Sequence, residues 1–187
     1  TKLPANAFVD CSLETVIMNA ELKEIGNSAF SGCTSLSKIE LSSGLNTIGN
    51  SAFSGCTNLS KIGLLSGLNT IGSSAFSGCT SLASIEIPES VTEINSNAFN
   101  GCTALESISI PKKITGISDN VFNGCSGLKK VNLPDTLTTI DYCAFKGCTG
   151  LTEIDIPETV TGICGLAFSN CTNLSKVSLP SGWETTY

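Results

Sequence analysis

Histidine and arginine are both absent from the 187 residues, and only 14% of the residues are charged. Without histidine, no Ser/His/Asp or Cys/His catalytic arrangement can form. Lysine alone supplies the ten basic residues and the net charge is −6, whereas nucleic-acid binding normally needs a basic surface rich in arginine. We therefore expect a protein that is not an enzyme, needs no cofactor and does not bind nucleic acid.

Long apolar runs are also missing, since no segment approaches the roughly 20 residues of a membrane span. We expect no membrane insertion in this segment. A secretory signal is not recognisable, and the first residue is Thr1 rather than methionine. We interpret the chain as a mature segment or an excised piece, from which targeting information has been removed.

What the sequence does have is a fixed period. Consecutive phenylalanines are 22 and then six times 23 residues apart. They are Phe8, Phe30, Phe53, Phe76, Phe99, Phe122, Phe145 and Phe168. A period in the twenties is typical of a solenoid, in which each coil contacts only its neighbours and the stacked coils share one core. Because the periodicity is unbroken, we expect one solenoid domain over residues 1–187 with about eight coils.

Each repeat contains the same local signals, as the coil between Phe76 and Phe99 illustrates. Leu82, Ile85 and Ile87 give the alternating pattern L-x-x-I-x-I, which predicts a short strand with one buried face. A proline follows the strand in five coils, where its missing N–H ends the pairing. A glycine two residues after the phenylalanine predicts a positive φ. The S-A-F-S-G-C segment predicts a turn or a single 3₁₀ turn, and no second regular strand is expected.

The full pattern, I-x-x-x-A-F-x-G-C-x-x-L-x-x-I-x-I-P-x-x-V-x-x-I, resembles the BspA-like leucine-rich repeat of bacterial and protozoan surface proteins. The match runs from Leu3 to Trp183. The resemblance implies a right-handed leucine-rich-repeat solenoid. One parallel β-sheet would line its concave face, and turns or 3₁₀ segments its convex face.

Cysteine follows every phenylalanine by three residues, so eight of the ten cysteines form one column. We expect this column to be a ladder of buried free thiols, because parallel side chains give the wrong torsion for disulfides. Cys143 and Cys164 lie outside the column, and a disulfide between them is left open. No C-x-x-C and no histidine supports a zinc site, so we expect no metal. Asn58, Asn170 and Asn173 match the N-glycosylation sequon, which arises easily by chance in such a chain.

The outward positions of the predicted strands are the candidate binding surface. The polar and charged residues there are Lys38, Glu40, Lys61, Glu86, Lys130, Asn132, Glu153, Asp155 and Lys176. Aromatic anchors, which dominate tight interfaces, are lacking, so we expect weak contacts multiplied along the array. Glu153 and Asp155 form an acidic pair on one predicted strand. We interpret them as solvated surface residues rather than catalytic groups, because acid–base catalysis needs an enclosed site.

The resemblance implies adhesion, since BspA-like proteins are associated with binding to matrix proteins such as fibronectin and fibrinogen and with co-aggregation of cells. We expect an extracellular or cell-surface module whose partners are surface or matrix proteins of a host or a neighbouring cell.

The alternative is a structural spacer or a filament subunit that stacks end to end. Nearly identical coils favour it, with SAFSGCT at 28–34, 51–57 and 74–80, and neither end shows a convincing cap, although Trp183 is a candidate lid. An intracellular scaffold, which free thiols would tolerate, is the third interpretation.

Overall fold

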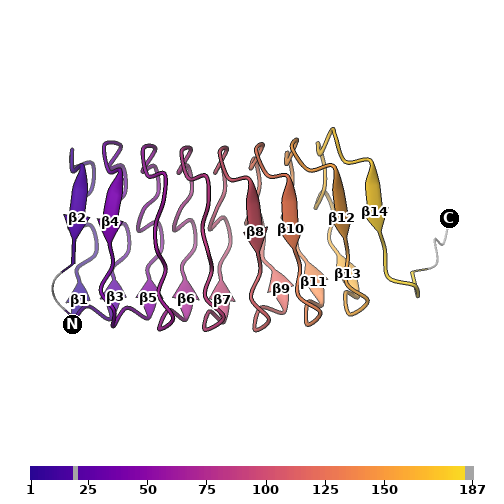
Figure 1. The fold of residues 1–187 in the computed structure, drawn as a ribbon, viewed down its shortest axis with the longest axis horizontal. Helices are drawn as coiled ribbons and strands as arrows, with labels where there is room; N and C mark the ends of the chain where they lie inside the picture. The colour runs from indigo at the N-terminus through magenta and orange to yellow at the C-terminus, as the bar shows by residue number, and fades with distance from the viewer. Residues whose placement is uncertain (19–20, 184–187) are drawn as a thin grey trace.

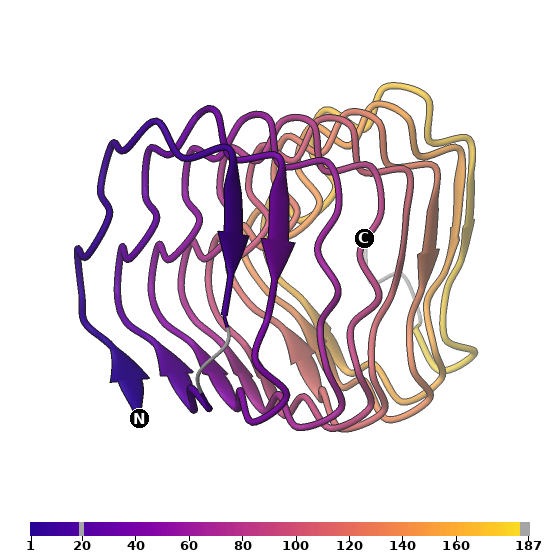
Figure 2. The same cartoon turned by 60° about the vertical axis from the view of Figure 1, so that its left-hand side comes forward.

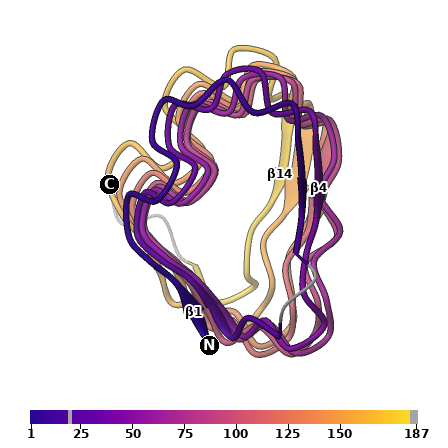
Figure 3. The ribbon, with the colours of Figure 1, turned by 90° about the vertical axis from the view of Figure 1, so that its left-hand side faces the viewer.

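Two ladders of short parallel strands run along a stack of coils. The computed structural model describes residues 1–18 and 21–183, and these residues contain strands β1 to β14 and no helix (Figure 1). Viewed along the stack, the coils superpose as a closed loop, with β4 and β14 on one side and β1 on the other (Figure 3). Nowhere in the described part of the chain is there a helix long and apolar enough to span a membrane. The predicted solenoid is confirmed.

The first ladder is built from the predicted L-x-x-I-x-I segments. Its strands are β2 (Thr15–Ile17), β4 (Lys38–Glu40), β8 (Ser107–Ser109), β10 (Lys130–Asn132), β12 (Glu153–Asp155) and β14 (Lys176–Ser178). They pair in parallel as β2–β4, β8–β10 and β12–β14, and the bridges Lys61–Ser84 and Ser84–Ser107 continue the ladder through the middle coils. Figure 2 shows β2 and β4 side by side. The middle residue of most strands points into the core, as the alternation predicted.

A second parallel ladder corrects the expectation of a single sheet. It consists of β1 (Lys2–Leu3), β3 (Glu24–Ile25), β5 (Thr47–Ile48), β6 (Thr70–Ile71) and β7 (Glu93–Ile94), followed by β9 (Gly116–Ile117), β11 (Thr139–Ile140) and β13 (Gly162–Ile163). Each strand is only two residues long, so no apolar alternation marks it in the sequence. Stacking on the neighbouring coils, rather than local pattern, forms these strands.

The phenylalanines form one stacked column through the core. Neighbouring ring centroids are 5.3–5.7 Å apart and their planes differ by 4–13°. All rings between Phe30 and Phe145 are buried. Offset stacking of this kind stabilises aromatic pairs beyond the burial of their area. The column therefore fixes the register of each coil on the next.

The cysteine column is a ladder of free thiols, as expected. From Cys33 to Cys171, each thiol donates to the carbonyl oxygen of the phenylalanine on the preceding coil, at 3.0–3.2 Å. The same carbonyl also accepts the backbone N–H of the cysteine in its own coil, as Phe30 does from Cys33. The thiols therefore add a polar link between coils while filling the core as small apolar groups.

Cys143 and Cys164 do not form the disulfide that the sequence left open. Both are free in the structure, with Cys143 buried and Cys164 exposed. They lie two residues before Phe145 and four residues before Phe168, so they belong to different columns of the coil. In the register of the two coils, Cys164 is aligned with Asp141 and Cys143 with Leu166, so the two thiols are not stacked on each other.

The segment around each phenylalanine consists of turns closed by i→i+3 hydrogen bonds, such as Cys33 N–H to Phe30 O at 3.2 Å, and none of them continues into a 3₁₀ helix among the described residues. The six glycines two residues after a phenylalanine have φ values of 72–74°, which confirms the predicted positive φ. Two residues before the phenylalanine, φ is also positive, for example 61° at Asn97 and 62° at Leu166. A 3₁₀ helix needs consecutive negative φ values, which these positions interrupt.

Candidate functional site

The outward side chains of the first ladder form a continuous exposed surface, here called the strand face. It comprises the first and third residues of each strand segment: Thr15, Ile17, Lys38, Glu40, Lys61, Gly63, Ser84, Glu86, Ser107, Ser109, Lys130, Asn132, Glu153, Asp155, Lys176 and Ser178. All sixteen are exposed. Because the alternate residues Ile39, Ile62, Ile85, Ile108 and Ile154 are buried, the outward set adds little to the core.

Six of the nine predicted site residues already have a partner within the protein. Lys38 Nζ lies 2.8 Å from Glu40 Oε1 on the same strand. Lys176 Nζ lies 3.2 Å from Glu153 Oε2, which joins β14 to β12. These pairs are exposed, so each contributes little to stability. Their charges nevertheless compensate each other on the surface.

Two further hydrogen bonds tie polar side chains across coils on the strand face. Ser178 donates to Asp155 Oδ1 at 2.5 Å, and Asn132 Nδ2 donates to Ser109 Oγ at 2.9 Å. Among the described residues, the other three predicted site residues, Lys61, Glu86 and Lys130, have no salt-bridge partner within 4.0 Å. The nine residues therefore share one face but differ in whether their polar groups are already engaged.

The strand face is hollowed in its middle coils. One hollow is lined by residues 61–64 and 84–86, and the next by residues 84–87 and 107–109. A side chain at Gly63 would meet nothing within 4 Å, so this glycine leaves the surface open. The sequence prediction selected charged positions and missed the small ones, Gly63, Ser84 and Ser107. The signal for them is the run of small residues in the strand columns of three successive coils.

A further hollow lies where β10 and β12 do not pair. Lys130, Asn132, Glu153 and Asp155 line it together with their strand neighbours. The ladder order places β8–β10 and β12–β14 in separate pairs, so β10 and β12 are not hydrogen-bonded to each other at this junction. Four of the predicted residues are brought together here.

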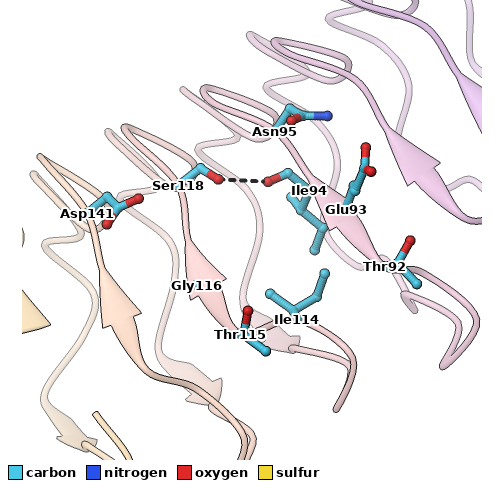
Figure 4. A pocket seen from close by; sticks show the side chains of 9 residues that line it. All are labelled: Thr92, Glu93, Ile94, Asn95, Ile114, Thr115, Gly116, Ser118 and Asp141. Atoms are coloured by element: carbon cyan, nitrogen blue, oxygen red, sulfur yellow. Dashed lines mark hydrogen bonds between the residues drawn. The ribbon is translucent and has the colours of Figure 1, made fainter. Parts of the chain in front are cut away.

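The second ladder is interrupted between β7 and β9, and a polar hollow of about 240 Å³ opens there (Figure 4). In the next coil, Thr138 N–H donates to Thr115 O at 2.7 Å. The corresponding bond from Thr115 to Thr92 is not formed. Instead, the Ser118 hydroxyl donates to Ile94 O at 3.1 Å. Side chains thus replace the backbone pairing at this seam.

Glu93 and Asp141 are the two carboxylates of this hollow, and they lie on opposite sides of it (Figure 4). Across the described residues, no group of three or more cysteine, aspartate and glutamate side chains is placed to hold a metal ion. The hollow is therefore a local opening of the ladder rather than a coordination site.

The buried thiols are poor nucleophiles. Burial raises the pKa of Cys56 and of Cys125 to about 12, from an ordinary value of 9.0. Burial also raises the pKa of Cys79 and Cys148. Reactive cysteines need a lowered pKa and solvent access. The thiol column is therefore structural.

The repeat pattern and the solenoid geometry have a direct counterpart among known families. The BspA type leucine rich repeat region, in six copies, matches residues 1–129 and 92–187. The chain belongs to this family. No functionally curated protein matches it.

Several solved structures are similar to this BspA-type chain. The T. pallidum leucine rich repeat protein is 36% identical, with a TM-score of 0.76 over 80% of this chain and 71% of that one. A leucine rich cell surface protein from Faecalibacterium prausnitzii is 35% identical, with a TM-score of 0.69 over 95% of this chain and 42% of that one. The pneumococcal vaccine antigen PcpA is 25% identical, with a TM-score of 0.58 over 94% of this chain and 53% of that one. The chain thus spans less than two thirds of the last two proteins.

Proposed function

We propose that this BspA-type solenoid is a non-enzymatic module of a cell-surface protein that binds surface or matrix proteins of a host or a neighbouring cell. The observation that carries the proposal is the strand face itself. Each coil presents two exposed residues at fixed spacing from a parallel ladder, and their side chains add little to the core. Membership of the family and the similarity to a leucine rich cell surface protein support the surface location.

Avidity provides the affinity in this proposal. The strand face has no aromatic residue and no arginine, which are the usual anchors of tight interfaces. Repeated weak contacts along one array bind more strongly together than separately, because the second contact forms within the complex. We therefore expect binding to weaken when coils are removed and when salt screens the charges.

The test measures binding of the protein to immobilised fibronectin and fibrinogen. One variant reverses six charges of the strand face: Lys38, Glu40, Glu86, Lys130, Glu153 and Asp155. A matched control reverses two lysines and four acids elsewhere: Lys113, Lys146, Glu21, Glu93, Asp135 and Asp141. The proposal predicts loss of binding in the first variant only. Equal binding by both variants, or no binding by the wild type, contradicts it.

A second candidate function is end-to-end self-association, which the exposed apolar side chains of the terminal coils favour. Phe8 is 38% exposed in the first coil, and Val177 is 44% and Leu179 49% exposed at or next to the last strand. Trp183 Nε1 donates to Val160 O at 3.2 Å, one repeat earlier in the same column, and 37% of Trp183 is exposed. In a longer chain, further coils would cover the same side chains.

Light-scattering mass against concentration tests this second candidate. Stacking of one copy on the next would continue the ladder without closure, so the mass should rise steadily with concentration and rods should form. A constant mass of 19.3 kDa contradicts self-association and leaves the strand-face proposal intact.

A further inference from the structure

We propose that the partner inserts one extended segment into the middle of the strand face, and that this segment carries acidic, basic and acidic side chains at alternate positions. This inference rests on the proposed function and narrows it to one part of the surface. The insertion site, here called the central trough, is lined by Lys61, Gly63, Ser84, Glu86, Ser107 and Ser109.

The shape of the central trough comes from small side chains. The two hollows share Ser84, Ile85 and Glu86, so they lie next to each other on three neighbouring coils, one on each side of the strand segment that carries Ser84. Gly63 contributes no side chain to it, and the space above its backbone is open. Serine hydroxyls along the floor can donate and accept hydrogen bonds, as the backbone of an inserted segment requires. A partner backbone can therefore approach the sheet here more closely than elsewhere.

The charges of the strand face favour the same place. On one side of the trough, Lys38 is paired with Glu40, and near the C-terminal end Lys176 is paired with Glu153. A partner charge at those positions meets two opposite charges that already compensate each other, so its net attraction is small. Within the described residues, no such pair engages Lys61, Glu86 or Lys130. New ion pairs with a partner are thus most favourable at these three residues.

The order and spacing of the three residues define the segment. Neighbouring parallel strands are about 4.8 Å apart, so Lys130, three coils beyond Lys61, lies about 14 Å away along the stack. Glu86 lies one coil after Lys61 and at the third rather than the first position of its strand segment, so it is about 6.8 Å to one side of the line between the two lysines. In an extended chain, every second side chain points the same way, at about 6.8 Å intervals. Side chains at i, i+2 and i+4 therefore span about 13.6 Å.

We therefore assign an acid, which faces Lys61, to position i of the segment. A lysine or arginine at i+2 faces Glu86, and an acid at i+4 faces Lys130. The segment runs along the stack, across the strands of the ladder. A helix would need about nine residues to cover the same length. Because it is about 10 Å wide, it would not use the close approach to the sheet that the small side chains of the trough allow. An extended polypeptide is thus the occupant that fits both the shape and the charges.

The test selects nonapeptides from a random library displayed on phage, with the intact protein as the immobilised target. We expect enrichment of the acid-x-base-x-acid pattern, and a synthetic peptide with this pattern should bind. Gly63→Trp fills the trough and Glu86→Lys reverses its central charge. Each should weaken peptide binding by at least about tenfold, Gly63→Trp by blocking the trough and Glu86→Lys by repelling the basic side chain of the peptide.

Gly165→Trp is the matched control for Gly63→Trp. A side chain at Gly165 likewise meets nothing within 4 Å, but the residue lies three positions before Phe168, away from the strand face. The control should bind the peptide as the wild type does. Selection of peptides without the alternating charges, failure to select any peptide, or equal binding by Gly63→Trp overturns the proposal.

Binding to the matrix proteins separates this inference from the function on which it rests. If the variant with six reversed charges loses that binding while Gly63→Trp and Glu86→Lys retain it, the strand face is the binding surface and the proposed insertion into the central trough is wrong. If all three variants retain it, the proposed binding face itself is wrong.

Discussion

Cys56 Sγ lies 3.1 Å from the carbonyl oxygen of Phe30 on the preceding coil, and this contact repeats at each step from Cys33 to Cys171. Every interior phenylalanine carbonyl thus has two donors, one from its own coil and one from the next. The thiol column explains why cysteine, rather than alanine, recurs at this position. It is small enough for the core and still donates a hydrogen bond.

Removing one thiol tests this role. Cys79→Ala deletes the hydrogen bond to Phe53 O and leaves a small void, so it should lower the free energy of unfolding by about 1 to 2 kcal/mol. Urea unfolding at neutral pH measures the change. The exposed Cys164 provides the control, and Cys164→Ala should alter stability by less than about 0.5 kcal/mol. Equal effects of the two substitutions would show that the thiol hydrogen bond contributes nothing.

Stability should fall at alkaline pH because the buried thiols resist ionisation. Burial raises the pKa of Cys56 and Cys125 to about 12, whereas unfolded cysteine ionises near 9.0. Between these values the folded state holds protons that the unfolded state has lost, so each thiol's contribution is complete below pH 9 and declines as pH rises toward 12. Urea midpoints between pH 7 and pH 11 should show this decline. A midpoint that stays constant to pH 11 contradicts it.

Leu166 occupies a backbone position that suits asparagine. Its φ is 62°, and 49% of the side chain is exposed, so the leucine has little packing to offset the strain. Leu166→Asn should raise the free energy of unfolding by about 1 kcal/mol. The reverse change, Asn97→Leu at a φ of 61°, should lower it by a similar amount. Thermal unfolding of both variants checks the prediction, which is wrong if the two shifts have the same sign.

The seam between β7 and β9 should exchange its amide hydrogens early. Thr115 and Gly116 lack the backbone acceptor that their counterparts Thr138 and Gly162 have on the preceding coil. Native-state hydrogen exchange should therefore be at least about tenfold faster at Thr115 and Gly116 than at Thr138 and Gly162. Ser118→Ala, which removes the hydroxyl link to Ile94 O, should widen the difference. Equal protection at both sites would mean that the seam is closed in solution.

The regular columns could be predicted from the sequence because each residue type reports one physical requirement. The phenylalanine spacing gave the coil length, and the glycines correctly marked the positive φ. The second ladder could not be predicted, since a strand as short as Thr47–Ile48 leaves no periodic signal. The sequence left the Cys143–Cys164 disulfide open, because proximity in adjacent coils does not fix the direction of a side chain, and both thiols are free in the structure.

Prediction of the strand face was incomplete for a different reason. The sequence showed which positions point outward, but only the structure shows that Glu153 is paired with Lys176 on the next coil, whereas Glu86 has no such partner among the described residues. Charge type can be read from a pattern. Charge compensation depends on rotamers and on contacts between coils, which the pattern does not contain.

The measurement that tests the central claim most directly is site-specific photocrosslinking to fibronectin and fibrinogen. A photoreactive phenylalanine derivative replaces Ser84 on the strand face in one variant and Glu93 on the second ladder in another, both at exposed positions. Binding through the strand face predicts covalent adducts with the matrix protein from position 84 and none from position 93. Adducts from position 93 alone, or from neither position, would contradict the account.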